Sequence, residues 1–206
     1  NFYNYISRNN ENKLYDIKDK RDILTEDFLL ELQPLFKKYN EIQEEIKNLY
    51  ANHNNMLQNI GKHYNSSDNT IFKNNWKSVQ LMKYDYINKV AKKYLPITFS
   101  EISKLDHFMG WAFISVLKPG TTIPTHRGKY NFKLTCHIGI SNLEDCFFII
   151  NNKKMIWKEN DFFVFNDSEY HKVVHNGKKD RIVLIFDLFH PELTLSDREC
   201  IKTILN

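Results

Sequence analysis

Two histidines and one arginine in the second half of the chain have residue types and positions suited to a chemical site. His126 follows the turn Pro119-Gly120, and His171 follows a polar turn after an apolar run. Neutral imidazoles bind iron, zinc, copper or nickel. Arg181 begins a strongly apolar run, where a guanidinium needs an anionic partner because an unpaired buried charge is costly. The pattern is compatible with a metal site beside an anion site.

The same residues also have a simpler interpretation, which the spacing leaves open. Each histidine would be a surface or hydrogen-bonded side chain. Arg181 would be a structural ion-pair partner of Asp187 or Asp161. The pattern therefore indicates a site without identifying it.

The composition is that of a globular chain, and the histidines, which can bind metals, are concentrated in its second half. The 206 residues carry 29 Lys and Arg against 25 Asp and Glu, and this small excess argues against a nucleic-acid partner. Five of the 6 Gly and six of the 8 His follow residue 100. The sequence contains no run of 18 apolar residues, so it predicts no membrane span.

The cysteines favour a reducing, cytoplasmic location. Cys136, Cys146 and Cys200 form neither a disulfide framework nor a CxxC pair, and the first two lie in apolar runs typical of buried free thiols. No secretory signal is visible. The chain begins at Asn1, which leaves open whether a targeting segment precedes it.

The elements that must position the site begin after a helical first third. Residues 1–22 are predicted to be a poorly ordered or peripheral segment, and apolar residues recur with helical spacing from 28 to 49. Thr25 is a candidate N-cap, and Pro34 predicts a break into two helices. Residues 53–70 read as a loop. We expect residues 1–73 to form a helical extension that packs on the following domain.

Residues 74–206 read as a β domain. A strand at 76–82 and a short helix at 86–94, ending before Pro96, precede a series of short apolar runs separated by turn signals. The expected strands are 111–117, 132–140, 146–150, 155–157, 162–165, 171–174 and 182–189. A capping box of Ser196 and Glu199 predicts a C-terminal helix. The pattern is typical of a sandwich or barrel with N-terminal helices, a mainly β, α+β class.

Several stretches resemble, in order, motifs of the aspartyl/asparaginyl β-hydroxylase family. Residues 115–128 read Ser-Val-Leu-Lys-Pro-Gly-Thr-Thr-Ile-Pro-Thr-His-Arg-Gly, which is similar to the family's first metal-binding segment. Its second metal segment resembles 157–161 with 165–171, and its closing strand and tail resemble 181–193. Its first strand and a later core strand resemble 75–81 and 133–140. The resemblance covers roughly residues 74–195.

The resemblance implies a distorted double-stranded β-helix, a jelly-roll or cupin-like barrel, that uses Fe(II), 2-oxoglutarate and O2. His126 and His171 match the iron ligands. The matches to cosubstrate positions are Ser115, His137 and Arg181, with the aromatic Trp76 nearby. Gly128 stands where many non-heme iron sites have a carboxylate. The chain therefore resembles the two-histidine members of the family.

One departure concerns the cations of the expected pocket. The family often carries Arg two residues before the position of His137, where this chain has Thr135. Lys133 lies two residues further back, and alternate strand residues share a face. We therefore expect Lys133, Thr135 and His137 to face the same pocket.

The expected reaction is hydroxylation of an unactivated C–H bond. The resemblance implies an aspartyl or asparaginyl side chain, a free amino acid or a peptide as substrate. Two alternatives stay open: a non-catalytic 2-oxoglutarate-binding homologue, and a radical halogenase with chloride beside Gly128. The sequence does not distinguish the oligomeric state.

Overall fold

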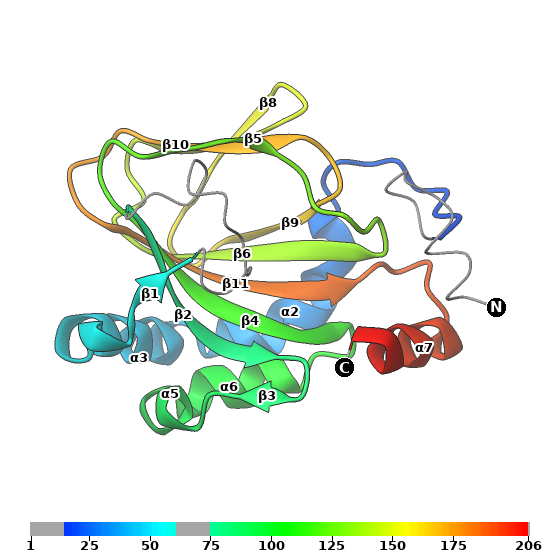
Figure 1. The fold of residues 1–206 in the computed structure, drawn as a ribbon, viewed down its shortest axis with the longest axis horizontal. Helices are drawn as coiled ribbons and strands as arrows, with labels where there is room; N and C mark the ends of the chain where they lie inside the picture. The colour runs from blue at the N-terminus through cyan, green and yellow to red at the C-terminus, as the bar shows by residue number, and fades with distance from the viewer. Residues whose placement is uncertain (1–14, 61–74, 206) are drawn as a thin grey trace.

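Two antiparallel sheets face each other and form a double-stranded β-helix, with helices outside the larger sheet (Figure 1). The computed structural model of the protein describes residues 15–60 and 75–205. The larger sheet has the order β1 (Gln58–Asn59), β2 (Trp76–Lys83), β4 (Phe108–Leu117), β11 (Arg181–Phe189), β6 (Lys133–Ser141) and β9 (Phe162–Asn166), and β3 (Tyr86–Ile87) pairs with β2. The smaller sheet has the order β5 (Thr122–His126), β10 (His171–His175), β7 (Cys146–Ile150) and β8 (Lys153–Ile156).

The central strands of the larger sheet are buried on both faces, which explains their nearly continuous apolar sequences. On β11, the even-numbered residues from Ile182 to Leu188 belong to the core on the helix side. The odd-numbered Val183 and Ile185 belong to the core between the two sheets. Because strand side chains alternate between faces, polar residues of odd number on β11 also point between the sheets.

Helices cover the outer face of the larger sheet (Figure 1). They are η1 (Thr25–Phe28), α2 (Leu29–Lys37), α3 (Tyr39–Asn52), η2 (Asn54–Met56), α5 (Lys89–Tyr94) and α6 (Pro96–Ser103), and α7 (Leu195–Leu205) follows the last strand. Leu32, Ile42 and Ile46 are fully buried in the same core as the even-numbered side of β11. The division at residues 73 and 74 stays a prediction. None of the helices in the described ranges is long and apolar enough to cross a membrane.

The first helical region differs in detail from its prediction. Two helices are present, but they separate at Lys38 and Pro34 lies inside α2. Leu30, four residues before this proline, is 86% exposed, so water can replace the helical bond that Pro34 cannot donate. Thr25 is not an N-cap, because its hydroxyl accepts from the Val164 amide at 3.1 Å.

The expectation of a peripheral segment over residues 1–22 is wrong for its last residues; residues 1–14 lie outside the described chain. The Asp22 carbonyl accepts from the Asn166 amide, and the Leu24 amide donates to the Val164 carbonyl, each at 2.9 Å. The segment thus pairs with the edge of β9, and such pairing satisfies backbone groups whatever the side chains are.

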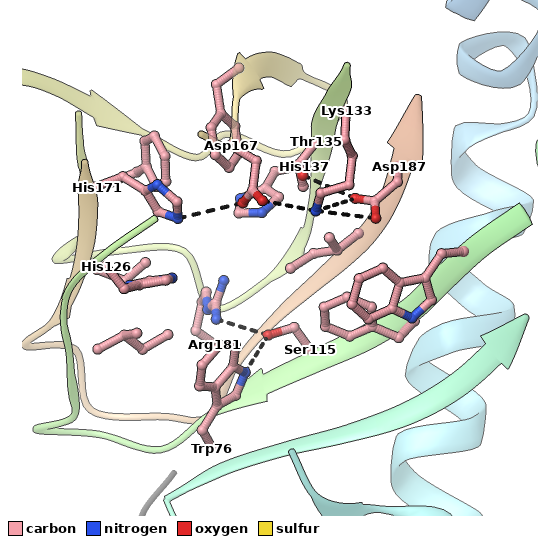
Figure 2. A pocket seen from close by; sticks show the side chains of 17 residues that line it. Trp76, Ser115, His126, Lys133, Thr135, His137, Asp167, His171, Arg181 and Asp187 are labelled. Atoms are coloured by element: carbon pink, nitrogen blue, oxygen red, sulfur yellow. Dashed lines mark hydrogen bonds and ion pairs between the residues drawn. The ribbon is translucent and has the colours of Figure 1, made fainter. Parts of the chain in front are cut away.

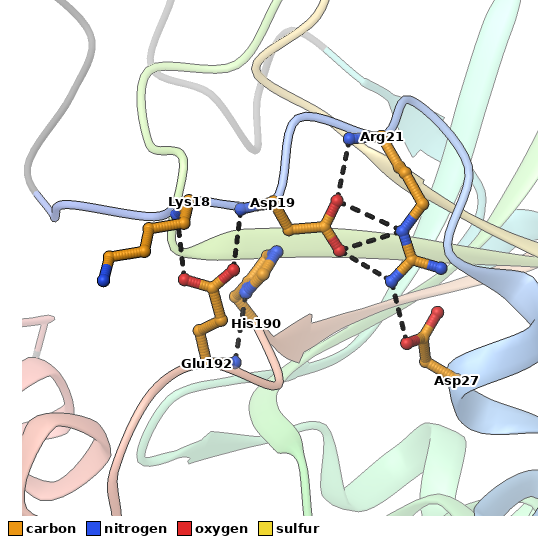
Figure 3. A network of polar contacts seen from close by, with 6 residues as sticks. All are labelled: Lys18, Asp19, Arg21, Asp27, His190 and Glu192. Atoms are coloured by element: carbon orange, nitrogen blue, oxygen red, sulfur yellow. Dashed lines mark hydrogen bonds and ion pairs between the residues drawn. The ribbon is translucent and has the colours of Figure 1, made fainter.

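A network of polar contacts also attaches this segment to the end of β11 (Figure 3). The amides of Lys18 and Asp19 donate to the Glu192 carboxylate at 2.8 and 2.7 Å. Arg21 in turn forms ion pairs with Asp19 and Asp27. The contacts join residues that are far apart in the chain, which is why the polar composition alone did not reveal them.

The C-terminal helix is confirmed, but its cap lies elsewhere. Thr194 and Asp197 form the reciprocal capping pair: the Thr194 amide and hydroxyl donate to Asp197 at 3.0 and 2.6 Å, and the Asp197 amide donates back at 3.2 Å. Ser196 lies inside α7, so the predicted pair of Ser196 and Glu199 is wrong by two residues. Both pairs have the residue spacing of a capping box, and the path that the chain takes after β11 decides which pair caps the helix.

Several further elements and boundaries were missed. Pro96 begins α6, because a proline suits the first helical turn, whereas the pattern predicted only a stop. Residues 86–87 are a strand, and the helix expected there begins at Lys89. The loop expected at 53–70 contains η2 and β1, and its residues 61–70 lie outside the described chain. β5 was not predicted, since Thr122–His126 has a proline and little apolar alternation.

Candidate active site

A cavity between the two sheets gathers every residue that the sequence placed in the site (Figure 2). The eight residues are Trp76, Ser115, His126, Lys133, Thr135, His137, His171 and Arg181. They come from both sheets, so the cavity depends on the packing of one sheet over the other. The expected shared face of Lys133, Thr135 and His137 is confirmed.

The two candidate metal ligands are direct neighbours across β5 and β10. His126 and His171 are paired in register, and their ring centroids are 4.2 Å apart. Each Nδ1 lies 2.8 Å from the backbone carbonyl oxygen two residues earlier, at Pro124 and at Glu169. A carbonyl only accepts, so each Nδ1 carries the proton and donates it. Each Nε2 therefore keeps a lone pair that can bind a metal.

The electrostatics of His171 favour the neutral, metal-binding form. Burial, followed by the nearby charge of His126, lowers the pKa of His171 to about 4. Its Nε2 lies 3.8 Å from Oδ1 of Asp167. At neutral pH the ring is therefore uncharged, the form in which histidine coordinates metals.

Arg181 is a buried cation that has no carboxylate partner among the described residues. It is 1% exposed, and its Nη2 donates to the Ser115 hydroxyl at 3.2 Å. The alternative of an ion pair with Asp187 or Asp161 is wrong, because Asp187 pairs instead with Lys133 and Asp161 bonds to the Phe162 amide. A buried guanidinium of this kind favours binding of an anion in the cavity.

The surroundings of Arg181 complete an anion-binding end of the cavity. Trp76 Nε1 also donates to the Ser115 hydroxyl, at 3.0 Å, which leaves that oxygen's own proton available to a ligand. His137 is 7% exposed, and its Nδ1 has no hydrogen-bond partner within the described chain. Burial, together with the charge of Arg181, holds the pKa of His137 well below its ordinary value. A neutral ring and a hydroxyl thus flank the guanidinium.

A second polar group lies apart from Arg181 and Ser115, along the upper part of the cavity in the view of Figure 2. Lys133 Nζ lies 2.9 Å from Oδ2 of Asp167 and 3.3 Å from Oδ2 of Asp187. The Thr135 hydroxyl donates to Oδ1 of Asp187 at 3.0 Å, because these two residues are paired across β6 and β11. Lys133 is thus held between two carboxylates.

The two carboxylates of this group, Asp167 and Asp187, were missed as site residues. Each had a signal in the sequence. Asp167 lies in the polar turn four residues before His171, and Asp187 is a lone charge in the apolar strand β11. A charged side chain in a strand that is buried on both faces needs a polar partner. Asp187 in this strand therefore predicts a polar site.

Gly128 is required by the close approach of Asp167. The Gly128 amide donates to the Asp167 carbonyl at 2.7 Å, and a Cβ on Gly128 would come within 1.8 Å of Oδ2 of Asp167. A carboxylate side chain at position 128 does not fit unless Asp167 moves. Within the described ranges, no group of three or more His, Cys, Asp or Glu side chains is placed to hold a metal.

The other described histidines and the cysteines have structural surroundings. His107 bonds to Glu31 at 2.6 Å, and His175 bonds to the Lys179 carbonyl at 2.8 Å. Cys136 and Cys146 are buried free thiols, as predicted. These groups play no part in the cavity.

Comparison with known proteins gives a family match over most of the chain. The family described as aspartyl/asparaginyl beta-hydroxylase matches residues 37–191. The match includes all eight predicted site residues and begins within the first helical region. The matched region therefore includes helix α3 as well as the barrel.

Curated relatives are similar over part of their length. An aspartate beta-hydroxylase domain-containing protein 2 of Xenopus tropicalis is 31% identical over 120 residues, which are 54% of this chain and 32% of the relative. The aspartyl/asparaginyl beta-hydroxylase of Homo sapiens is 29% identical over 137 residues, or 64% and 18% of the two chains. This chain thus matches a third or less of these relatives.

Two solved structures show limited similarity to this chain. The cupin domain of Schizosaccharomyces pombe Cnp3 is 12% identical, with a TM-score of 0.39 over 57% of this chain and 67% of that one. A Photorhabdus luminescens protein, plu4264, is 11% identical, with a TM-score of 0.40 over 65% and 87%.

Proposed function

Because this chain belongs to the aspartyl/asparaginyl β-hydroxylase family, we propose that it is a hydroxylase dependent on Fe(II), 2-oxoglutarate and O2. The observation that carries the proposal is Arg181, a buried guanidinium without a carboxylate partner in the described chain, in the same cavity as two histidines with free Nε2 lone pairs. A dicarboxylate that also chelates a metal suits both features at once.

The residues present fit a ferrous ion held by two protein ligands. His126 and His171 would supply their Nε2 atoms, and the carbonyls of Pro124 and Glu169 hold both rings in the required tautomer. Bound iron with 2-oxoglutarate and O2 supplies the oxidising power for C–H hydroxylation. The protein's own contribution is to orient the cosubstrate, exclude water and position the substrate.

The anion-binding end would orient the cosubstrate. Arg181 would bind the distal carboxylate of 2-oxoglutarate, with the Ser115 hydroxyl donating to it. Trp76 keeps the Ser115 oxygen engaged as an acceptor, which directs that hydroxyl proton toward the ligand. His137 offers its unpartnered Nδ1 to the middle of the cavity.

Hydroxylation is favoured over halogenation. A chloride beside Gly128 would lie next to the Asp167 carboxylate, and like charges repel. A non-catalytic binding protein remains the second candidate, because Thr135 replaces a cation that family members often carry. The substrate we propose is an amino-acid side chain in a peptide or protein, or a free amino acid.

The proposal is tested by 2-oxoglutarate binding and turnover with Arg181→Gln. Wild-type protein should bind 2-oxoglutarate in a metal-dependent manner, and the variant should lose affinity by about 100-fold, the effect of removing one charge-assisted pair. Calorimetry with Mn(II) measures binding, and succinate release with Fe(II) measures turnover.

Arg198→Gln is the matched control, because Arg198 is also a buried arginine but contacts Asp106 and His107 outside the cavity. It should bind 2-oxoglutarate as the wild type does. Equal affinity in the wild type and Arg181→Gln would refute the assignment, and binding without turnover of any tested substrate would select the non-catalytic alternative.

A further inference from the structure

The connection between β8 and β9 crosses from the smaller sheet to the larger one (Figure 1). Of residues 151–160, which include β8 and most of this connection, Trp157 alone is buried. Its side chain is 4% exposed, whereas that of the preceding Ile156 is 52% exposed. The indole belongs to the core between the two sheets. The connection therefore inserts one aromatic ring between the sheets.

Close packing against β6 fixes the position of this ring. An isolated bridge between Gly139 and Glu159 joins the connection to β6. A Cβ on Gly139 would lie 2.5 Å from the Lys158 carbonyl oxygen, so the two backbones approach this closely because residue 139 is glycine. Phe163 packs on the indole, with the ring centroids 5.6 Å apart. Trp157 is thus held through both its backbone and its ring.

The indole contacts two groups at the anion-binding end of the cavity. The guanidinium carbon of Arg181 lies 5.0 Å from the centroid of the Trp157 ring, within the range of about 6 Å for a cation–π contact. The ring of His137 is nearly parallel to the indole, at 16°, with the centroids 5.9 Å apart. Arg181 is 1% exposed, so water screens the cation–π contact little.

Few other contacts fix the orientation of Arg181. Its Nη2 donates to the Ser115 hydroxyl at 3.2 Å, whereas its Nε is buried without a hydrogen-bond partner in the described chain. A long side chain held by one hydrogen bond keeps several rotamers unless packing removes them. The Nε1 of Trp157 is also buried without a partner among the described residues. The indole therefore contributes its ring, and not its N–H group, to this arrangement.

We propose that Trp157 is a positioning residue for 2-oxoglutarate, because it holds the Arg181 guanidinium in the orientation that receives the distal carboxylate. Trp157 is not among the residues that line the cavity, so it acts through Arg181 and does not touch the ligand. The inference rests on the proposed function and deepens it, since it names a residue outside the cavity on which selection of the cosubstrate depends. Without the indole, binding must restore one orientation of the guanidinium from several.

Two 2-oxo acids separate this role from a general structural one. 2-Oxoglutarate and 2-oxopentanoate have the same chain length and the same metal-chelating group, but only 2-oxoglutarate has a distal carboxylate. Calorimetry on protein loaded with Mn(II) gives both dissociation constants, and their ratio measures recognition of that carboxylate. Wild-type protein should bind 2-oxoglutarate about 100-fold more tightly, the effect of one charge-assisted pair. General damage to the barrel weakens both acids and leaves the ratio unchanged.

Three variants of Trp157 test its ring. Trp157→Leu should lower the ratio about tenfold, the size of a desolvated cation–π contact, and should change the dissociation constant of 2-oxopentanoate less than about twofold. Trp157→Met keeps more of the volume and should have the same effect, so it decides the question if the leucine variant misfolds. Trp157→Phe keeps an aromatic face and should hold the ratio within about threefold of the wild-type ratio.

Phe163→Leu is the matched control, because it removes an aromatic ring from the same core while the contact between Trp157 and Arg181 stays in place. Phe163 is 4% exposed, as Trp157 is, and its ring centroid lies 5.3 Å from that of His137. This variant should keep the wild-type ratio. In the double variant of Arg181→Gln and Trp157→Leu, the ratio should equal that of Arg181→Gln alone, since the indole acts through the guanidinium.

The outcomes separate this inference from the proposed function. A wild-type ratio in Trp157→Leu and Trp157→Met, or an equal fall in Phe163→Leu, overturns the positioning role, while a ratio that depends on Arg181 still supports the proposed function. An unchanged ratio in Arg181→Gln overturns the proposed function itself. The expected result is a ratio that falls in the leucine and methionine variants and is kept in Trp157→Phe and Phe163→Leu.

Discussion

At the scale of single residues, the buried Asp187 carboxyl group lowers the free energy of unfolding by an amount that depends on pH. Burial, and then Asp167, raise its pKa from 3.8 to about 6 against the influence of Lys133. A raised carboxyl pKa means that the folded state favours the protonated form. The contribution of Asp187 to stability is therefore fully present below about pH 3.8 and is lost as the pH rises through about 6.

We expect Asp187→Asn to stabilise the protein at pH 7.5, because the amide mimics the protonated acid. The free energy of unfolding should rise by about 1–2 kcal/mol at pH 7.5, and the gain should shrink toward pH 4.5. Urea unfolding at both pH values measures it. Asp85→Asn, at an exposed turn, should change little at either pH; a pH-independent loss in Asp187→Asn would contradict the assigned charge state.

Gly128 and Asp167 should be coupled in stability. A Cβ at position 128 would overlap the Asp167 carboxylate, so Gly128→Ala should cost about 1–3 kcal/mol, as overpacking does. In an Asp167→Ala background the same change should cost much less. A double-mutant cycle by urea unfolding gives the coupling energy. If the two costs simply add, the close approach does not exist in solution.

At the scale of elements, the start of α7 distinguishes two capping pairs that the sequence allows equally. Thr194→Ala should lower the free energy of unfolding by about 1 kcal/mol, because it removes the hydroxyl that accepts from the Asp197 amide. Ser196→Ala, inside the helix, should be close to neutral. Urea unfolding compares them, and a larger loss in Ser196→Ala would restore the pair of Ser196 and Glu199.

Several strands of the barrel were predicted more accurately than the helix ends, for a physical reason. β7 begins and ends as predicted, and β9, β10 and β11 each gain one residue. Apolar runs between turn residues define a strand locally. The break between α2 and α3 and the cap of α7 depend instead on long-range contacts, such as the bond of the buried Tyr39 hydroxyl to the Gly139 carbonyl at 2.7 Å.

At the scale of the whole molecule, the first helices and the barrel share one core. We therefore expect a single unfolding transition. The three tryptophans lie in the barrel, at its cavity or in the core between the sheets, whereas far-UV circular dichroism at helical wavelengths reports the helices. The two signals should have the same midpoint in urea, as a two-state transition requires.

Leu32→Ala in α2 should move both signals together, with a cost of about 2–5 kcal/mol, because Leu32 is fully buried against the sheet. Leu30→Ala, at an 86% exposed position of the same helix, is the matched control and should move neither. A shift of the helical signal alone would show that residues 25–52 unfold separately from the barrel.

The sequence by itself determined which side chains share a face. Strand alternation is a property of the local backbone, so Lys133, Thr135 and His137 were correctly assigned to one side. The apolar sequence around Arg181 likewise predicted a buried cation. Trp76, Ser115 and His137 entered the predicted site through the family resemblance instead, and all eight predicted residues line the cavity.

Only the tertiary structure decided which charges meet. Lys133, Asp167 and Asp187 come from β6, from the turn between β9 and β10, and from β11. Their contacts depend on the pairing register of strands that are distant in the chain, which no local pattern specifies. The sequence therefore determined the face on which a charge lies, and the tertiary structure determined that Lys133 meets two carboxylates while Arg181 meets none among the described residues.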